Sequence, residues 1–145
     1  MKNFLLLLIC FCFLSCASDK FVRKAKHKES TQDLIEFKDY LLKNNVMDDF
    51  KESRPITGIK DPVILGFYNK YNVGSMHIWK CGEDNYDTPS SPFITCGDTI
   101  DLYYNGTHMI STIHAITFDY SSEPLELKAS IDEEKHKITN RIYVF

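Results

Sequence analysis

Three histidines are the residues of this chain best suited to proton transfer: His77, His108 and His114. Histidine changes charge near neutral pH, so it often acts as a general base when a carboxylate orients it. His108 and His114 are six residues apart, which on a regular strand puts them on one face but about 20 Å from each other. They are too far apart to share a proton or a metal. A small envelope hydrolase built on one histidine and a nearby carboxylate is one hypothesis, and structural histidines are the simpler one.

Other signatures of catalysis and nucleotide binding are missing from the sequence. No serine lies in a Gly-x-Ser-x-Gly turn, and no His-Glu-x-x-His pair is present. The six glycines are scattered singly, so the chain has neither a Gly-x-Gly-x-x-Gly fingerprint nor a phosphate-binding loop. We therefore expect no cofactor, and we favour a non-enzymatic role.

A polar segment over residues 82–91 and the residues just after it carry side chains suited to recognition. Clustered carboxylates bind calcium weakly, but the ordered spacing of an EF-hand is absent, so we predict no metal site. Rigid aromatic side chains among polar neighbours are favoured in binding loops. The candidate recognition loop consists of Glu83, Asp84, Tyr86, Asp87 and Phe93.

The first fifteen residues predict export. A short charged start precedes an eleven-residue apolar run, Phe4–Leu14. A membrane-spanning helix needs about 20 apolar residues, whereas a run of this length is typical of the central region of a signal peptide. We expect residues 1–15 to be removed during export.

The end of this signal, Phe13-Leu14-Ser15-Cys16, resembles the lipobox of bacterial lipoproteins. The resemblance is limited to residues 1–16 and implies that Cys16 carries a lipid such as palmitate, becomes the new N-terminus and anchors the chain to a membrane. Residues 16–30 would then form a polar, basic tether beside an anionic membrane surface. The alternative is cleavage after Ala17, which would release a soluble secreted protein.

The cysteine count then predicts one disulfide. Cys10 and Cys12 leave with the signal and Cys16 is lipidated or removed, so Cys81 and Cys96 remain. Two remaining cysteines in an oxidising compartment most often pair, and a ring of this size contributes roughly 3 kcal/mol. A zinc site is the alternative, but neither cysteine has a Cys-x-x-Cys partner or a histidine at ligand spacing.

Residues 31–145 predict a single α+β domain that begins with a helix. Ser30 or Thr31 can cap the helix, and Leu34, Phe37 and Leu41 recur at helical spacing. The helix should end near residues 44–45. The apolar segment over residues 63–71 is compatible with either a helix or a strand.

The second half of the domain predicts strands. They are expected over residues 75–81, 99–104, 107–120, 125–132 and 138–144. Asn105-Gly106 is the preferred two-residue hairpin turn between two of them. Asn105 also begins an Asn-x-Thr sequon, which would be a glycosylation site in a eukaryotic or viral protein. We expect an N-terminal helix packed on an antiparallel sheet of about five strands.

The domain is acidic. From Glu29 onward there are 11 lysine and arginine residues against 19 aspartate and glutamate residues, a net charge of −8. Nucleic acid requires a basic face, so we expect no nucleic-acid partner, whereas an acidic surface speeds encounter with a basic protein. The sequence favours a membrane-anchored binding or inhibitor lipoprotein of the immunity type, in a bacterial envelope and facing the periplasm or the surface. A soluble secreted effector that binds an extracellular receptor is the alternative.

Overall fold

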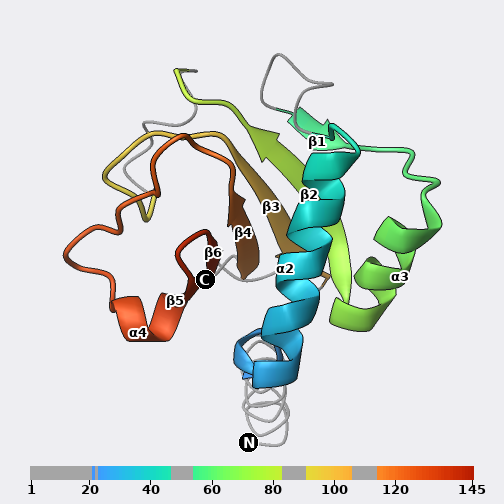
Figure 1. Cartoon of the computed structure of the whole chain (residues 1–145), viewed down its shortest axis with the longest axis horizontal. Helices are drawn as coiled ribbons and strands as arrows, with labels where there is room; N and C mark the ends of the chain where they lie inside the picture. Colours follow the sequence, from blue (N-terminus) through green and yellow to red (C-terminus); the bar gives the residue numbers. More distant parts are fainter. Residues whose placement is uncertain (1–20, 22, 47–53, 83–90, 106–113) are drawn as a thin grey trace, which may run out of the picture.

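The protein is an α+β domain with helices on one face of an antiparallel sheet, as expected (Figure 1). The computed structural model describes residues 21, 23–46, 54–82, 91–105 and 114–145. The helices are α2 (Lys28–Lys43), α3 (Pro62–Tyr71) and α4 (Glu133–His136). The strands are β1 (Arg54–Ile56), β2 (Val73–Trp79), β3 (Thr99–Tyr104), β4 (Ala115–Asp119), β5 (Lys137–Thr139) and β6 (Ile142–Val144).

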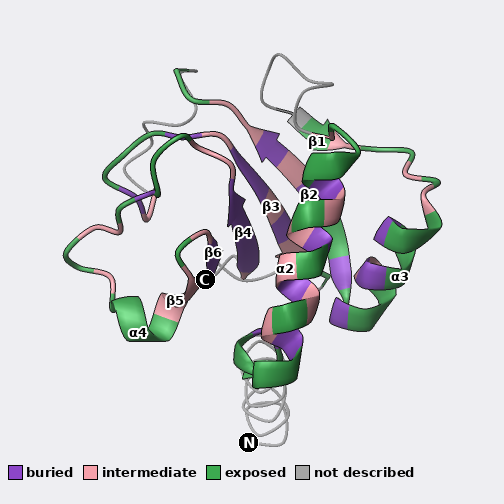
Figure 2. Cartoon of the chain, in the orientation of Figure 1, coloured by how far each residue is buried: buried purple, intermediate pink, exposed green. Residues whose placement is uncertain are grey.

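The sheet has six strands in the order β1-β2-β3-β4-β6-β5, one more than the sequence suggested. The central strands are largely buried, and α2 shows its buried residues along one stripe (Figure 2). Leu34, Phe37 and Leu41 form this stripe, as their spacing predicts. Phe37 stacks on Phe67 of α3 with ring centroids 3.7 Å apart, and lies 6.1 Å from Phe118 of β4. One aromatic residue thus joins both helices to the sheet.

The segment that the sequence left open, residues 63–71, is a helix because its first turn is capped. The side chain of Asp61 accepts hydrogen bonds from the backbone N–H groups of Val63, at 2.8 Å, and Ile64, at 3.1 Å. Pro62 then supplies a fixed φ at the first helical position. Tyr40 donates to the same carboxylate at 2.6 Å, so this cap also ties α3 to α2.

Residues before α2 pack against the domain. Residues 23–26 are helical, and Phe21 and Ala25 are buried in the main core. Lys26 donates to the carbonyl oxygens of Glu134, at 2.5 Å, and Lys135, at 2.8 Å. The part of the predicted tether that the structure describes is therefore held to the domain surface.

The prediction of a two-residue turn at Asn105-Gly106 is wrong. The backbone N–H of Tyr104 donates to the carbonyl oxygen of His114 at 3.0 Å, so its partner is not the residue just after Gly106. Asn105 instead donates its backbone N–H to Asn72 at 2.8 Å. This long-range contact continues the pairing of β3 with β2 beyond Tyr104, and residues 106–113 lie outside the described ranges. The second predicted arm, residues 107–120, is described only from residue 114, and its strand is β4.

The predicted strand over residues 125–132 is also wrong. Only Leu127 pairs there, in an isolated bridge to Phe93, and the C-terminal hairpin is β5–β6. Leu125 is still buried, because it packs with Phe93 and Tyr143 in a second small core, and Leu127 packs against that core partly buried. Tertiary contacts hold this segment in an irregular conformation in which Leu125 is buried and Ala129 is exposed.

The carboxylate of Asp119 provides those contacts. It is fully buried at the end of β4 and accepts the backbone N–H groups of Ser121, at 2.8 Å, and Leu125, at 3.0 Å. The guanidinium of Arg141 donates to the same carboxylate at 3.2 Å. Arg141 also donates to the carbonyl oxygens of Ser121 and Ser122. Asp119 and Arg141 together therefore fix the chain reversal after β4 and the turn before β6.

We predict that Asp119→Asn lowers the free energy of unfolding by about 3 kcal/mol, because removing one partner of a buried ion pair leaves the other uncompensated. Urea unfolding measures the loss. Glu133→Gln is the control, since it removes only the exposed ion pair with Lys137, and such pairs contribute less than about 1 kcal/mol. Similar losses in the two variants would contradict the structural role of Asp119.

Candidate functional site

The face of the sheet opposite α2 and α3 carries a group of polar and aromatic side chains. Alternate residues of a strand point to opposite faces, and residues of β2 and β3 such as Met76 and Leu102 are buried in the main core with the helices. The register of the strands places their neighbours together on the other face. We call this group the β2–β4 site, and its members are Ser75, His77, Trp79, Asp101, Tyr103 and Thr117.

Asp101 lies at the centre of the β2–β4 site. It is paired across the sheet with His77 on β2 and with Thr117 on β4. Tyr103, two residues along the same strand, donates its hydroxyl to Oδ2 of Asp101 at 3.2 Å. The His77 ring stacks on Trp79 with centroids 4.2 Å apart and planes 20° apart. The site therefore combines a carboxylate with three rings.

The charge state of Asp101 is unusual. Burial raises the pKa of Asp101 to about 6 and outweighs the polar side chains of Thr117, Tyr103 and Trp79, which favour the ionised form. Oδ1 of Asp101 is buried, and no hydrogen-bond partner for it lies within the described part of the chain. Burial also lowers the pKa of His77, so this ring is neutral at pH 7. A half-buried carboxylate with one buried oxygen and a perturbed pKa beside aromatic rings is typical of a functional site.

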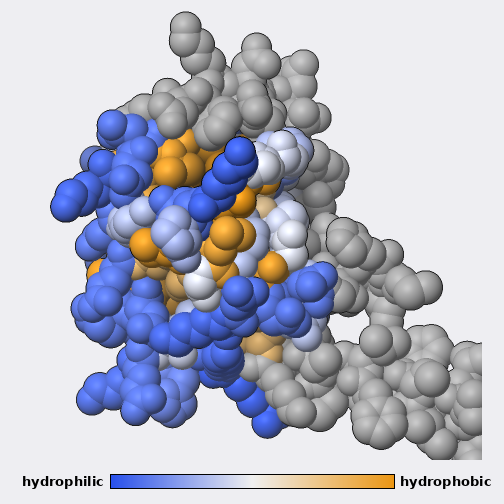
Figure 3. All heavy atoms as spheres, turned by 90° about the vertical axis from the view of Figure 1, so that its right-hand side faces the viewer, coloured by the Kyte–Doolittle hydropathy of each residue, from blue (hydrophilic) through white to orange (hydrophobic). Residues whose placement is uncertain are grey.

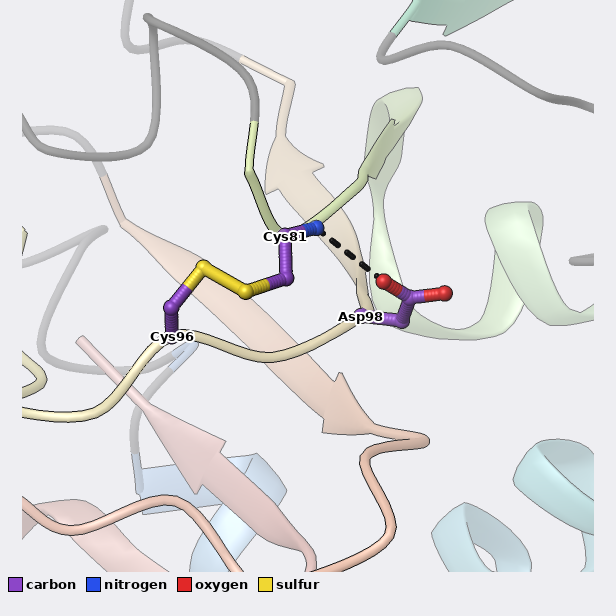
Figure 4. Close-up of a disulfide and its surroundings, with 3 residues drawn as sticks. All are labelled: Cys81, Cys96 and Asp98. Atoms are coloured by element: carbon purple, nitrogen blue, oxygen red, sulfur yellow. Dashed lines mark hydrogen bonds between the residues drawn. A yellow bond between two sulfur atoms is a disulfide. The ribbon is translucent and has the colours of Figure 1, made fainter.

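The predicted disulfide between Cys81 and Cys96 is present, with Cα atoms 5.4 Å apart (Figure 4). The backbone N–H of Cys81 donates to Asp98 Oδ1 at 3.0 Å, and Lys80 donates to Oδ2 of the same residue at 2.8 Å. Cys81 comes two residues after Trp79 and Cys96 three residues before β3. The bridge thus joins the strand ends beside the β2–β4 site, and it is consistent with a protein outside the cytoplasm.

Of the five residues of the predicted recognition loop, only Phe93 lies within the described ranges. Glu83, Asp84, Tyr86 and Asp87 lie outside the described residues. The expectation of a surface anchor at Phe93 is corrected, because this side chain is only 7 % exposed. Its ring packs edge-on against Tyr143 and Phe145, at centroid distances of 5.0 and 5.7 Å. Phe93 therefore fastens its segment to the second core.

The described candidate histidines, His77 and His114, do not share a hydrogen-bonded site. His114 lies with Nδ1 3.2 Å from the carbonyl oxygen of Phe145, and His108 is outside the described residues. Ser75, His77 and Asp101 share a face, yet within the described ranges no hydrogen bond links them. Those ranges also contain no cluster of histidine, cysteine and acidic side chains suited to a metal ion.

Two other predicted positions remain untested. Cys16 lies outside the described residues. Asn105 is exposed just after β3, and its glycosylation stays a prediction. No helix in the described part of the chain is long and apolar enough to cross a membrane.

On the side of the molecule that carries α3, the described residues show scattered apolar surface. Apolar surface there is interrupted by hydrophilic residues (Figure 3). Leu42, Val63 and Leu65 of the two long helices are 51 %, 46 % and 40 % exposed. Single exposed apolar residues are common on soluble domains and need no ligand.

Sequence reasoning missed Trp79, Asp101 and Tyr103. The available signal was the alternation in β3, where Thr99, Asp101 and Tyr103 occupy every second position beside apolar Ile100 and Leu102. Comparisons of the chain with protein-family models, characterised proteins and solved structures found no match. Its function is therefore argued from the β2–β4 site.

We predict that Asp101→Asn stabilises the protein at pH 7.5. The pKa of Asp101 rises from 3.8 to about 6 on folding, so ionising this group opposes folding. The penalty is nearly absent at pH 4, grows as the pH rises, and is complete above pH 6 at no more than about 3 kcal/mol.

Urea unfolding of the wild type and the variant at both pH values measures this difference. Asp101→Asn should gain about 1–3 kcal/mol at pH 7.5 and almost nothing at pH 4. The exposed Glu126 provides the matched control, Glu126→Gln, which should change little at either pH. A gain that does not depend on pH would exclude the titration of Asp101 as its cause.

Proposed function

We propose that the protein is an exported, membrane-anchored binding or inhibitor module of a bacterial envelope, of the immunity type. The observation that carries this proposal is the β2–β4 site, where stacked rings lie beside a carboxylate with an unpaired buried oxygen. Aromatic anchors next to a charged group are typical of the residues that dominate binding energy. The disulfide and the strand pairing hold them on a rigid surface.

Membrane anchoring at Cys16 would place this domain close to the bilayer. The described part of the chain begins to pack into the core at Phe21, five residues after Cys16. Five residues span at most about 18 Å when fully extended. A lipid on Cys16 would therefore hold the domain beside the headgroups, with the basic residues Arg23, Lys24 and Lys28 near that surface.

A binding role fits the β2–β4 site better than hydrolysis. A catalytic histidine must be able to exchange a proton with a nucleophile while a third group orients it. Within the described residues no hydrogen bond joins the His77 ring to a nucleophile or to Asp101, its cross-strand partner. The net charge of −8 from Glu29 onward favours a basic protein as partner, because such a surface accelerates encounter with opposite charge.

The intact mass of the protein recovered from cells tests the anchor. We expect a chain that begins at Cys16 and carries a diacylglycerol, with Cys81 and Cys96 oxidised. An unmodified chain that begins at Ser18 would support the soluble secreted effector instead. Recovery with Met1 in place and both cysteines as free thiols would contradict export altogether.

Capture of a partner from envelope extracts tests binding. The wild-type protein should retain a partner at low salt and lose most of it at high salt, because salt screens attraction between opposite charges. Trp79→Ala should abolish capture. Leu65→Ala is the matched control, since it truncates a partly exposed apolar side chain on α3. Equal capture by both variants, or no salt-sensitive partner under any condition, would count against the proposal.

A further inference from the structure

We propose that the β2–β4 site binds a cationic side chain, an arginine or lysine of a basic protein partner, with Asp101 as the ionic acceptor and the Trp79 ring beside it. This inference rests on the binding function proposed above and names the chemistry that the partner must present. It does not depend on the membrane anchor.

Two aspartates in the same sheet, Asp101 and Asp119, have different sets of partners. Asp119, on the same face as Asp101, receives two backbone N–H groups and the guanidinium of Arg141. Asp101 receives the hydroxyl of Tyr103, and the polar groups of Thr117 and Trp79 also favour its ionised form, but its Oδ1 is buried without a hydrogen-bond partner among the described residues. An unpaired buried acceptor costs roughly 1–3 kcal/mol. A cation supplied by another molecule would give Asp101 what Arg141 gives Asp119.

Within the described ranges, no cation is among the groups that act on Asp101. The titratable groups on this face of β2, β3 and β4 are His77, Asp101, Tyr103 and Asp119 in the described ranges. His77 is neutral at pH 7 because burial lowers its pKa, and Arg141 compensates Asp119. At the end of β2, Lys80 forms an ion pair with Asp98. None of the groups that shift the pKa of Asp101 is a cation.

Aromatic side chains lie beside Asp101, namely Tyr103 and Trp79. A cation over the face of a tryptophan or tyrosine within about 6 Å of the ring centre is attracted by the ring electrons. The described part of the domain already uses that contact three times: Lys24 and Lys70 lie 5.1 and 5.8 Å from the Tyr71 centroid, and Lys38 lies 4.4 Å from that of Tyr120. Trp79 offers a larger ring next to a carboxylate. An anionic ligand would instead be repelled by Asp101.

Trp79 is the single tryptophan of the chain, so its fluorescence reports directly on this site. We would titrate the purified protein, with its disulfide formed, with N-acetyl-arginine amide at pH 7.5. N-acetyl-citrulline amide is the matched control because it replaces the guanidinium with a neutral group of the same shape. We expect saturable binding of the arginine probe with a Kd in the millimolar range, which corresponds to a binding free energy of about −4 kcal/mol. The citrulline probe should bind at least tenfold more weakly.

Three further measurements assign the response to Asp101. Asp101→Asn should weaken arginine binding at least tenfold, whereas Glu126→Gln should leave it unchanged. Lowering the pH from 7.5 to 5 should weaken binding by about tenfold, because protonation of Asp101 removes the acceptor charge. Asp101→Asn should keep the native fold, since it removes an unfavourable buried charge.

Equal responses to the arginine and citrulline probes would overturn the inference, as would unchanged binding by Asp101→Asn. If the arginine probe fails to bind while partner capture still depends on Trp79, cation recognition is wrong and the binding function stands. If neither probe nor partner binds, both proposals fail. Sedimentation analysis tests whether the protein self-associates. Self-association that Asp101→Asn abolishes would identify a second copy of this chain as the occupant of the site and would overturn the claim of a different partner.

Discussion

The buried carboxylate of Asp119 determines how the chain is arranged on the face of the sheet opposite α2 and α3. It binds the chain just after β4 and, through Arg141, the turn that precedes β6. These contacts bring Leu125 over Tyr143, whose hydroxyl donates to the carbonyl oxygen of Leu125 at 2.8 Å. The second core then forms over this end of the sheet. The β2–β3 end keeps its polar and aromatic residues half-buried.

Asp119 and Asp101 show two outcomes for a carboxylate on the same sheet. Asp119 is satisfied by hydrogen bonds and an ion pair, so its charge contributes to the fold. Asp101 is desolvated without equivalent compensation, so its charge opposes folding at neutral pH. Proteins retain such unfavourable groups where binding or chemistry requires them. This contrast is the physical reason why the proposed binding site is centred on Asp101.

The disulfide is informative about both the fold of the domain and its cellular location. It joins the end of β2 to the segment before β3, the two strands that carry His77, Trp79 and Asp101. A domain of this size has a limited core, and a covalent bridge reduces the conformational freedom of its unfolded chain. Such bridges persist in oxidising compartments. The same bond therefore stabilises the site and is consistent with a location outside the cytoplasm.

The sequence by itself determined the features that depend on near neighbours or on simple counting. The spacing of Leu34, Phe37 and Leu41 predicted α2, the alternation from Thr99 to Tyr104 predicted β3, and the cysteine count predicted the disulfide. Tertiary structure decided the features that depend on partners distant in the chain. Asn105 pairs with Asn72 across β2 and β3, and Asp119 holds residues 121–125 away from a regular strand. The pairing of β2 with β3 places His77 opposite Asp101. Local periodicity shows which side of a helix or strand is apolar. Strand register and the pairing of polar side chains depend instead on contacts between segments that are distant in the sequence, and no local pattern encodes those contacts.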